Sequence, residues 1–528
     1  MFNLPERRYT VRMAGRWTRL RRFTRFSLRT FVLLLLLLGA AGALWRQWEP
    51  WVEVAVLEFE AQPISSVSFS PDGSKILTFS YGGSLFTSSP VKAPNMMRTW
   101  SSNDFRPLAQ MEWGEHPGDS GTAGGRFSPD GKWLVSEMVG HVHLCRLFDA
   151  ETGADILETN AQKIEFLRAS SLALVHTEAG SCFIYDLEQG VRWAEIGHPK
   201  SMITTAHATP NAEFIVTLGD SIRLLNGVIA PRVASLCIWN ARSGKLVRTL
   251  TDELNQSVYS HYLSYDGKLV IGVMEEQKKT AVWKLDTGEK IAEFEGVPID
   301  SNPLIPNSYL ILMRLEDWKF RVLDLANGKV IAQLAGHPLF PKPFTSDGRK
   351  LVIYDRDWGG LTILNHPEFV QTPPIKPIGS YDYSIISQDN KFVTLICYRS
   401  LSRTEVHIYN LEHGMYVMDC RADTAIITKL GYAVTCAAHG KYPIQIWNLN
   451  THSIAFELPL GTYKAISASP DGQRIAFISP DGTARVWERR RDEGTAGLFA
   501  LPSLWLTALF FTAFFWSAFR DVKELKSA

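Results

Sequence analysis

One short pattern, a Ser-Pro-Asp-Gly turn between two apolar segments, recurs along the chain and constrains its fold more than any other feature. It occurs in "FSPDGSKIL" from Phe69, "FSPDGKWLV" from Phe127 and "ASPDGQRIA" from Ala468, with looser forms in "LSYDGKLVI" from Leu263 and "FTSDGRKLV" from Phe344. Serine, proline and glycine occupy positions that a type I turn prefers. Because the flanking segments alternate or are apolar, with many β-branched and aromatic residues, each copy predicts a β-hairpin.

The aspartates of these turns form a regular series: Asp72, Asp130, Asp266, Asp347 and Asp471. Acidic residues at regular intervals could also indicate calcium binding or catalysis. Turn geometry already accounts for an acid at this position, because its side chain bonds to the backbone of the turn. We therefore predict a turn-forming role for all five.

A second pattern follows each hairpin. An apolar strand containing a large anchor residue leads into a polar turn, often closed by glycine, and then into another strand, as in "VWKLDTGEKIAEF" from Val282. The predicted anchors are Trp100, Phe148, Tyr185, Trp239, Trp283, Tyr409, Trp447 and Trp487, with Leu323 and Leu364 at equivalent places. They recur at intervals of about 40 residues, the period of a four-stranded propeller blade.

This phased repeat predicts an all-β fold, a β-propeller of four-stranded antiparallel blades. One twisted sheet with two apolar faces cannot bury both by itself, whereas radial stacking buries them. About ten units can be counted, against the four to eight blades typical of propellers. The sequence leaves open one large ring, two unequal rings, or a smaller ring with insertions.

The chain resembles the WD-repeat β-propeller family over about residues 51–490. Gly-His pairs occur at Gly197-His198 and Gly336-His337, but the Trp-Asp pair is never intact, since Asn240 follows Trp239. The resemblance implies a rigid platform for binding other proteins. The departure puts in doubt the family's His–Ser/Thr–Trp–Asp hydrogen-bond network in most blades.

The two ends of the repeat region predict how the ring closes. The last unit stops at "ARVWERRR" and lacks a fourth strand, whereas "WVEVAVLEFEA", residues 51–61, is an extra strand before the first hairpin. If this strand completes the last blade, no sheet edge stays open. It would also bring the two chain ends together. The alternative is a free linker strand.

Apolar segments flank the repeat region. Residues 30–48 predict a transmembrane anchor or a cleaved signal peptide, and residues 497–519 predict a transmembrane helix. The basic segment 1–29 carries nine arginines, and 520–528 forms a short tail. The positive-inside bias predicts a cytoplasmic N-terminus, a propeller outside the cytoplasm and contact with the lipid bilayer.

Other chemistry is sparse. Lys and Arg total 55 and Asp and Glu 54, so we expect no nucleic-acid partner. His141 and His143 lack a visible third metal ligand, and no catalytic or cofactor motif occurs. The six cysteines favour buried apolar side chains over a disulfide framework.

We therefore expect a membrane-anchored scaffold or sensor that binds other proteins, with no catalysis, cofactor or metal. The insertions at 82–106 and 221–235 are the expected binding surface. Two alternatives remain: a propeller enzyme or small-ligand binder that uses the central channel, and a structural subunit of an envelope assembly.

Overall fold

The computed structural model describes two helices and a β-propeller. The described residues are 28–47, 51–59, 62–80, 95–113, 122–139, 144–167, 171–198, 202–221, 224–225, 228–229, 233–250, 258–274, 277–299, 303–315, 319–334, 336–339, 342–355, 360–367, 369–371, 375, 381–400, 403–436, 443–458, 464–490 and 502–527. The chain divides into two compact units, Met1–Val52 with Arg489–Ala528, and Glu53–Glu488.

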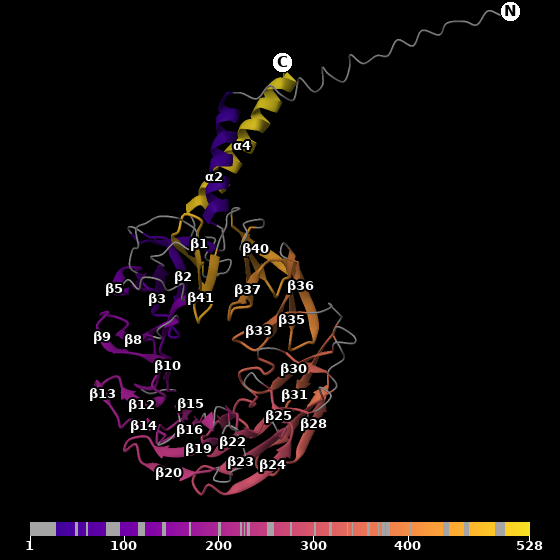
Figure 1. The fold of residues 1–528 in the computed structure, drawn as a ribbon. Helices are drawn as coiled ribbons and strands as arrows, with labels where there is room; N and C mark the ends of the chain where they lie inside the picture. Colours follow the sequence, from indigo (N-terminus) through magenta and orange to yellow (C-terminus); the bar gives the residue numbers. More distant parts are fainter. Residues whose placement is uncertain are drawn as a thin grey trace, which may run out of the picture. The chain divides into compact units, whose positions relative to one another are not determined.

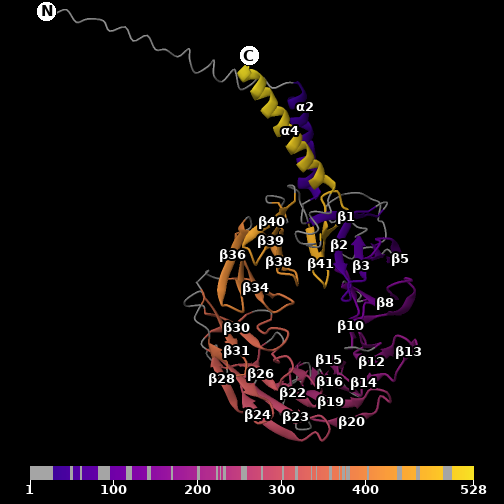
Figure 2. The ribbon, with the colours of Figure 1, turned by 180° about the vertical axis from the view of Figure 1, so that it is seen from behind.

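The second unit is a ring of ten blades in the described part of the chain (Figures 1 and 2). Blade 1 contains β2 (Ile64–Phe69), β3 (Lys75–Ser80), β4 (Asn95–Ser101) and β5 (Pro107–Trp113); blade 2 contains β6 (Thr122–Phe127), β7 (Trp133–Val139), β8 (Leu144–Asp149) and β9 (Asp155–Thr159); blade 3 contains β10 (Ala161–Phe166), β11 (Leu172–Thr177), β12 (Ser181–Asp186), β13 (Val191–Arg192) and β14 (Ile196–Gly197); blade 4 contains β15 (Met202–Ala208), β16 (Phe214–Ser221), β19 (Val233–Asn240) and β20 (Leu246–Thr249); blade 5 contains β21 (Ser260–Leu263), β22 (Leu269–Met274), β23 (Lys279–Lys284) and β24 (Lys290–Glu295).

The second half of the ring repeats the pattern. Blade 6 contains β25 (Val297–Pro298), β26 (Leu310–Arg314), β27 (Phe320–Asp324) and β28 (Val330–Leu334); blade 7 contains β29 (His337–Pro338), β30 (Lys350–Asp355), β31 (Gly360–Asn365) and β32 (Val370–Gln371); blade 8 contains β33 (Tyr383–Ile386), β34 (Phe392–Ser400), β35 (Arg403–Asn410) and β36 (Met415–Arg421); blade 9 contains β37 (Thr424–Ile427), β38 (Tyr432–Cys436), β39 (Gln445–Asn448) and β40 (Ser453–Glu457); blade 10 contains β41 (Lys464–Ala468), β42 (Arg474–Ile478), β43 (Ala484–Arg489) and β1 (Trp51–Leu57).

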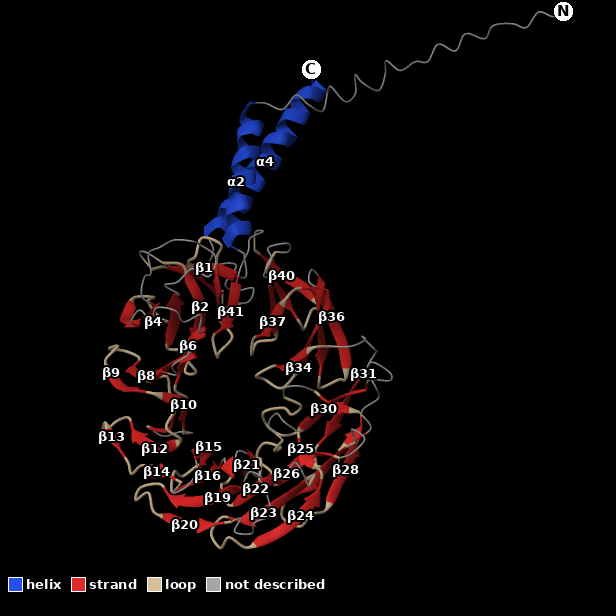
Figure 3. Cartoon of the chain, viewed as in Figure 1, coloured by secondary structure: helices blue, strands red, loops and turns tan. Residues whose placement is uncertain are grey.

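Within blades 1–9 the strands follow one another along the chain and pair antiparallel, and in blade 10 the strands β41, β42 and β43 do the same. The first strand lies nearest the centre of the ring and the fourth lies at its rim, as β10 and β13 of blade 3 show (Figure 3). Each polar turn ends one strand and reverses the chain into its neighbour, which is why hairpin signals in the sequence became adjacent strands. The predicted all-β propeller of four-stranded antiparallel blades is confirmed, and the ten units form one ring.

The predicted closure of the ring is also confirmed. The sheet of blade 10 has the order β1-β43-β42-β41, so the N-terminal strand occupies the fourth position that the last repeat lacks. Arg485 of β43 pairs with Glu53 of β1, with 3.1 Å between Nη1 and Oε2. Leu57 of β1 is buried in one cluster with Ile76 of blade 1 and Val486 of blade 10.

Apolar side chains fill the spaces between neighbouring blades. Successive residues of one strand point to opposite faces of its sheet. In β3, Ile76 packs in the cluster shared with blade 10, whereas Leu77 and Phe79 pack in the cluster shared with blade 2. In β22, Val270 faces blade 4 and Ile271 faces blade 6. Both faces of a blade are therefore buried only when both neighbours are present.

Two blades depart from a plain meander. In blade 3 the third strand β12 pairs with both β13 and β14, so this sheet has five strands. In blade 4 the connection between β16 and β19 carries a small hairpin of β17 (Leu224–Leu225) and β18 (Val228–Ile229). This hairpin belongs to the predicted insertion 221–235.

The other unit holds the two helices, α2 (Leu28–Gln47) and α4 (Pro502–Ser527), which pack against each other. Thr30 of α2 is buried and its Oγ1 lies 2.6 Å from Oγ of Ser517 in α4. The expected proximity of the two apolar segments is thus confirmed. No helix within the described residues has the length and apolar character that crossing a membrane requires. The predicted spans 30–48 and 497–519 extend beyond the described side chains.

All six cysteines are free thiols, and every one except Cys420 is buried. Cys182 and Cys397, for example, are fully shielded within strands β12 and β34. Burial raises the pKa of the Cys182 thiol to about 12, with Glu195 adding to the shift. The five buried cysteines act as small apolar core residues, as predicted from the sequence.

Closure by β1 makes a specific stability prediction. Leu57→Ala removes a side chain that is 1 % exposed, whereas Val56→Ala in the same strand alters a side chain that is 46 % exposed. A buried leucine truncated to alanine costs about 2–5 kcal/mol. We expect Leu57→Ala to lower the thermal unfolding midpoint clearly and Val56→Ala to leave it nearly unchanged. Equal midpoints for the two variants would contradict the packing of β1.

Candidate functional site

The connections from first to second strand and from third to fourth strand lie at the same end of each blade, because the strands run as an antiparallel meander. We call the surface that they form the turn face. Its first-to-second strand turns are residues 70–74, 128–132, 209–213, 264–268, 305–309, 345–349, 387–391, 428–431 and 469–473.

The structure places the five predicted aspartates in these turns. In blade 5, Ser264 Oγ donates to Asp266 Oδ1 at 2.8 Å, and the backbone N–H of Lys268 donates to the same oxygen at 3.1 Å. The serine or threonine hydroxyl of the other four turns donates to its aspartate in the same way, at 2.5 Å for Asp72, 2.5 Å for Asp130, 2.6 Å for Asp347 and 2.5 Å for Asp471. Each carboxylate is thereby engaged in holding its own turn.

The glycine of each turn has two roles: it adopts the backbone conformation of the turn, and it leaves room for the turn of the neighbouring blade. Gly267 has φ of 72°, in the left-handed region, and a Cβ there would lie 2.7 Å from Cδ of Pro210 in the turn of blade 4. Gly131 likewise has φ of 71°, and a Cβ would lie 2.7 Å from Oδ1 of Asp72. Only glycine combines this backbone conformation with such a close approach.

The predicted anchors all lie on third strands, and two of them donate a hydrogen bond from the indole. Trp100 Nε1 donates to Thr78 Oγ1 at 2.8 Å, and Trp239 Nε1 donates to Thr217 Oγ1 at 2.7 Å. In blade 4 the ring nitrogen Nε2 of His198 also lies 2.8 Å from Thr217 Oγ1. Blade 4 therefore holds a His–Thr–Trp chain, built from the Gly-His pair at 197–198.

The remaining anchors serve packing. Phe148, Tyr185, Trp283 and Tyr409 are buried within the clusters between blades. Trp447 and Trp487 are half-buried, and within the described residues neither indole N–H has a hydrogen-bond partner. Trp487 packs instead against Phe456 of blade 9, with 5.1 Å between ring centroids.

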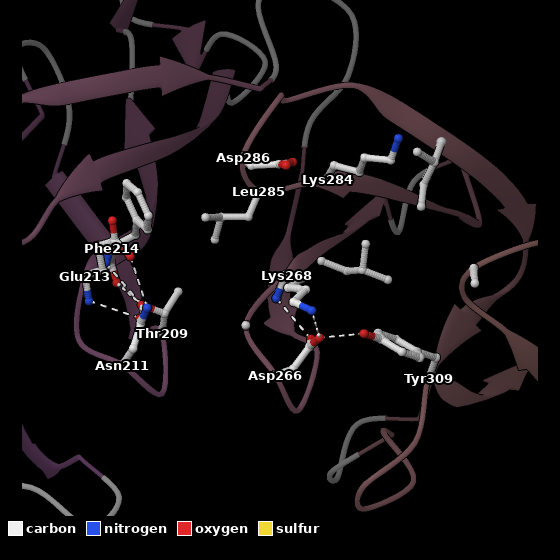
Figure 4. Close-up of a pocket in the computed structure, with 14 residues that line it drawn as sticks. Thr209, Asn211, Glu213, Phe214, Asp266, Lys268, Lys284, Leu285, Asp286 and Tyr309 are labelled. Atoms are coloured by element: carbon white, nitrogen blue, oxygen red, sulfur yellow. Dashed lines mark hydrogen bonds and ion pairs between the residues drawn. The ribbon is translucent and has the colours of Figure 1, made fainter.

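A pocket of about 650 Å³ opens on the turn face where blades 4, 5 and 6 meet (Figure 4). Its lining residues are Thr209, Asn211, Glu213 and Phe214 of blade 4, Asp266, Gly267, Lys268, Leu269, Lys284, Leu285, Asp286 and Ile291 of blade 5, and Tyr309 and Ala326 of blade 6. Leu269 and Leu285 are buried, whereas Phe214 and Ile291 are half-buried. The pocket thus combines an apolar wall with charged groups.

A hydrogen bond between blades fixes one side of this pocket. The hydroxyl of Tyr309 in blade 6 donates to Asp266 Oδ2 of blade 5 at 2.5 Å (Figure 4). Partial burial would raise the pKa of Asp266, but the hydrogen bonds from Tyr309 and Ser264 outweigh it and hold that pKa below its ordinary value. The same bond to Asp266 raises the pKa of Tyr309 to about 12. Asp266 is therefore a fixed negative charge at neutral pH.

The third-to-fourth strand turn of blade 5 breaks the repeat pattern at this pocket. In six other blades an aspartate or asparagine at the end of the third strand accepts backbone N–H groups of the turn: Asp149, Asp186, Asn240, Asp324, Asn410 and Asn448. Blade 5 has Lys284 there, and its Nζ bonds Glu289 Oε2 at 2.8 Å. Alignment of "WKLDTG" with "FDAETG" and "YDLEQG" would have revealed this departure in the sequence.

A histidine pair, in which His261 is buried and His207 is half-buried, joins the first strands of blades 4 and 5. His207 Nδ1 of β15 and His261 Nε2 of β21 lie 3.1 Å apart, and the carbonyl oxygen of Val216 lies 3.1 Å from His261 Nε2. Burial lowers the pKa of His261 to about 3, with His207 adding to the shift. Burial also lowers the pKa of His207, which Glu165 raises and Lys163 lowers. Both imidazoles are neutral at pH 7 and act in packing.

Some sites considered from the sequence lie outside the described residues. These are His141 and His143, and parts of the two insertions 82–106 and 221–235. Among the described residues no cluster of three or more potential ligands could hold a metal ion.

Comparison with known proteins gives one family match. The family model for "WD domain, G-beta repeat" matches residues 51–86, the segment of β1 and the first hairpin. No curated protein sequence matches the chain. The matched repeat supports a WD-repeat type of propeller.

Three solved structures are among those similar in fold to this chain. A eukaryotic initiation factor has 13 % identity and a TM-score of 0.48, with 69 % of this chain and 89 % of that chain covered. The C-terminal WD40 domain of Sif2 has 11 % identity and a TM-score of 0.39, with 84 % and 99 % covered. BamB from Moraxella catarrhalis has 15 % identity and a TM-score of 0.35, with 63 % and 95 % covered.

The buried His261 predicts a pH dependence of stability. The folded-state pKa of His261 lies below its ordinary value, so the unfolded chain binds more protons than the folded chain at acidic pH. The stability that the neutral imidazole contributes is therefore complete above about pH 6.5 and is lost as the pH falls below that value. We expect His261→Gln to reduce the slope of the free energy of unfolding against pH by up to about 1.4 kcal/mol per pH unit. The measurement is the denaturation midpoint from pH 8 to pH 4.

The matched control is His413→Gln in an exposed turn of blade 8, which should keep the wild-type profile. A His261→Gln profile parallel to that of the wild type would show that the pair does not titrate with unfolding.

Proposed function

We propose that this chain is a membrane-tethered β-propeller that serves as a scaffold or sensor for other proteins. The observation that carries the scaffold function is the turn-face pocket, where side chains of three blades meet at the surface of a closed ring. A rigid ring supports such a binding surface because its turns can vary without disturbing the buried strands. The WD-repeat match points to the same class of function by analogy.

The enzyme alternative lacks a comparable observation. His261 is buried and His207 is half-buried, both imidazoles are neutral, and Asp266 of the pocket is engaged in its own turn. A hydrolytic or transfer reaction needs a nucleophile or base directed at a substrate position. We therefore keep protein binding as the proposed activity.

The tether rests on the side chains that the helix pair exposes. In α2, Phe31 and Leu38 are 53 % and 60 % exposed, and in α4, Leu509, Trp516 and Phe519 are 61 %, 70 % and 78 % exposed. Apolar area in water is unfavourable by about 25 cal/mol per Å². Lipid tails would cover these side chains, and the nine arginines of residues 1–29 would stay on the cytoplasmic side.

The tether can be tested with charges on α4. Leu509→Lys with Phe515→Lys places two cations on exposed helix positions, and a lysine at the centre of a spanning helix costs about 2.5–3.5 kcal/mol. We expect the native protein to remain in the membrane pellet after alkaline carbonate extraction and the double variant to be released. Release of the native protein would contradict the tether.

The control carries the same two charges on the propeller, as Val247→Lys with Val330→Lys, at side chains that are 45 % and 41 % exposed. It should stay in the pellet. Protease digestion of right-side-out vesicles then tests the orientation, since we expect the propeller to be cleaved. A fully protected propeller would contradict the proposed placement outside the cytoplasm.

Scaffold function predicts contacts to a discrete partner at the turn face. A photo-crosslinking amino acid at Lys268, which lines the pocket, should capture one or a few proteins in native membranes. The same amino acid at Val330, on the fourth strand of blade 6, is the control. Adducts between copies of this chain alone would favour the envelope-subunit alternative, and the absence of any adduct at Lys268 would contradict the proposed binding face.

A further inference from the structure

We propose that the turn-face pocket of blades 4–6 binds a short peptide segment of a partner protein that presents an apolar side chain next to a lysine or arginine. This inference rests on the proposed scaffold function and names the chemistry of the partner. It follows from the size of the pocket, its apolar wall, the balance of its charges and the break in the repeat at blade 5.

The size and the apolar wall suit a short segment of chain. The pocket volume of about 650 Å³ lies within the range of about 300–1,000 Å³ that ligand sites occupy. Leu269, Leu285, Phe214 and Ile291 supply apolar contacts along the wall. An apolar side chain of the partner would be removed from water there, which is the main source of affinity at small sites.

The charges of the lining favour a cation. Three carboxylates, those of Glu213, Asp266 and Asp286, line the pocket with two lysines, Lys268 and Lys284. Lys268 Nζ lies 3.6 Å from Asp266 Oδ2, and Lys284 Nζ is paired with Glu289 Oε2 at 2.8 Å. Both lysines are therefore already engaged with acids.

Two carboxylates remain for the partner. Within the described residues, neither Glu213 nor Asp286 forms an ion pair, and both side chains are exposed. Asn211 Nδ2 donates a hydrogen bond to Glu213 Oε2 at 3.1 Å but brings no charge. A lysine or arginine of the partner would complete this set, whereas an acidic segment would meet a net negative lining.

Hydrogen bonds within the protein fix the shape of the pocket before any ligand binds. Tyr309 and Ser264 both donate to Asp266 from different blades, which fixes one wall. Lys284 stands where six other blades carry a turn-capping Asp or Asn, and Asp286 projects from the same turn. A local departure from a structural repeat is expected where the surface serves a function.

The test uses the purified full chain in detergent and a displayed library of random heptapeptides. We expect selected peptides to share a lysine or arginine beside an apolar residue. For a synthetic peptide of that type, fluorescence anisotropy should show Asp286→Asn weakening binding about tenfold and Lys284→Asp strengthening it, with affinity falling as salt rises.

Glu151→Gln is the matched control for Asp286→Asn, because Glu151 occupies the equivalent place in the turn of blade 2, outside the pocket. It should bind the peptide as the wild type does. Equal affinity of the Asp286→Asn and Glu151→Gln variants, or selection of acidic or uncharged peptides, would overturn the inference and leave the scaffold function standing. Failure to select any peptide would overturn the inference as well, and crosslinking at Lys268 would then decide the scaffold function separately.

Discussion

The burial of both faces of every blade against its neighbours is the interaction on which the rest of this structure depends. A four-stranded sheet such as that of blade 1 sends Ile76 to one side and Leu77 to the other, and each side chain is buried by a different neighbour. A row of such sheets would leave an apolar face exposed at each end. Closing the row into a ring removes both exposed faces, and β1 removes the last open strand edge.

Much of this architecture could be predicted from local sequence. The turn glycines and aspartates indicated the hairpins, the anchors indicated the third strands, and the extra strand predicted at 51–61 indicated the closure, because each depends on a few neighbouring residues. The number of blades in one ring could not be predicted, because it depends on the angle between packed sheets. The pocket could not be predicted for a similar reason, because it depends on contacts between blades: the hydroxyl of Tyr309 in blade 6 donates to Asp266 in blade 5.

The repeat also explains where function can be placed. Side chains of the buried strands pack against neighbouring blades, so changes there would disturb the ring. Turns that face solvent tolerate changes in sequence more readily. Blade 5 uses that freedom at Lys284 and Asp286, and the neighbouring turns of blades 4 and 6 supply the remaining walls of the pocket. In the other unit, apolar side chains of α2 and α4 are exposed around a partly buried Thr30–Ser517 contact. The turn-face pocket and the exposed apolar side chains of the helices thus belong to separate units, and neither requires a change in the buried strands.

Hydrogen–deuterium exchange of the full chain tests the closed ring most directly. If β1 is the fourth strand of blade 10, amides of Glu53–Leu57 should exchange as slowly as those of the fourth strand β24 in blade 5, because both are held by a neighbouring third strand. Exchange of the β1 segment at the rate of an unstructured peptide, with β43 exchanging as an open edge, would contradict the account.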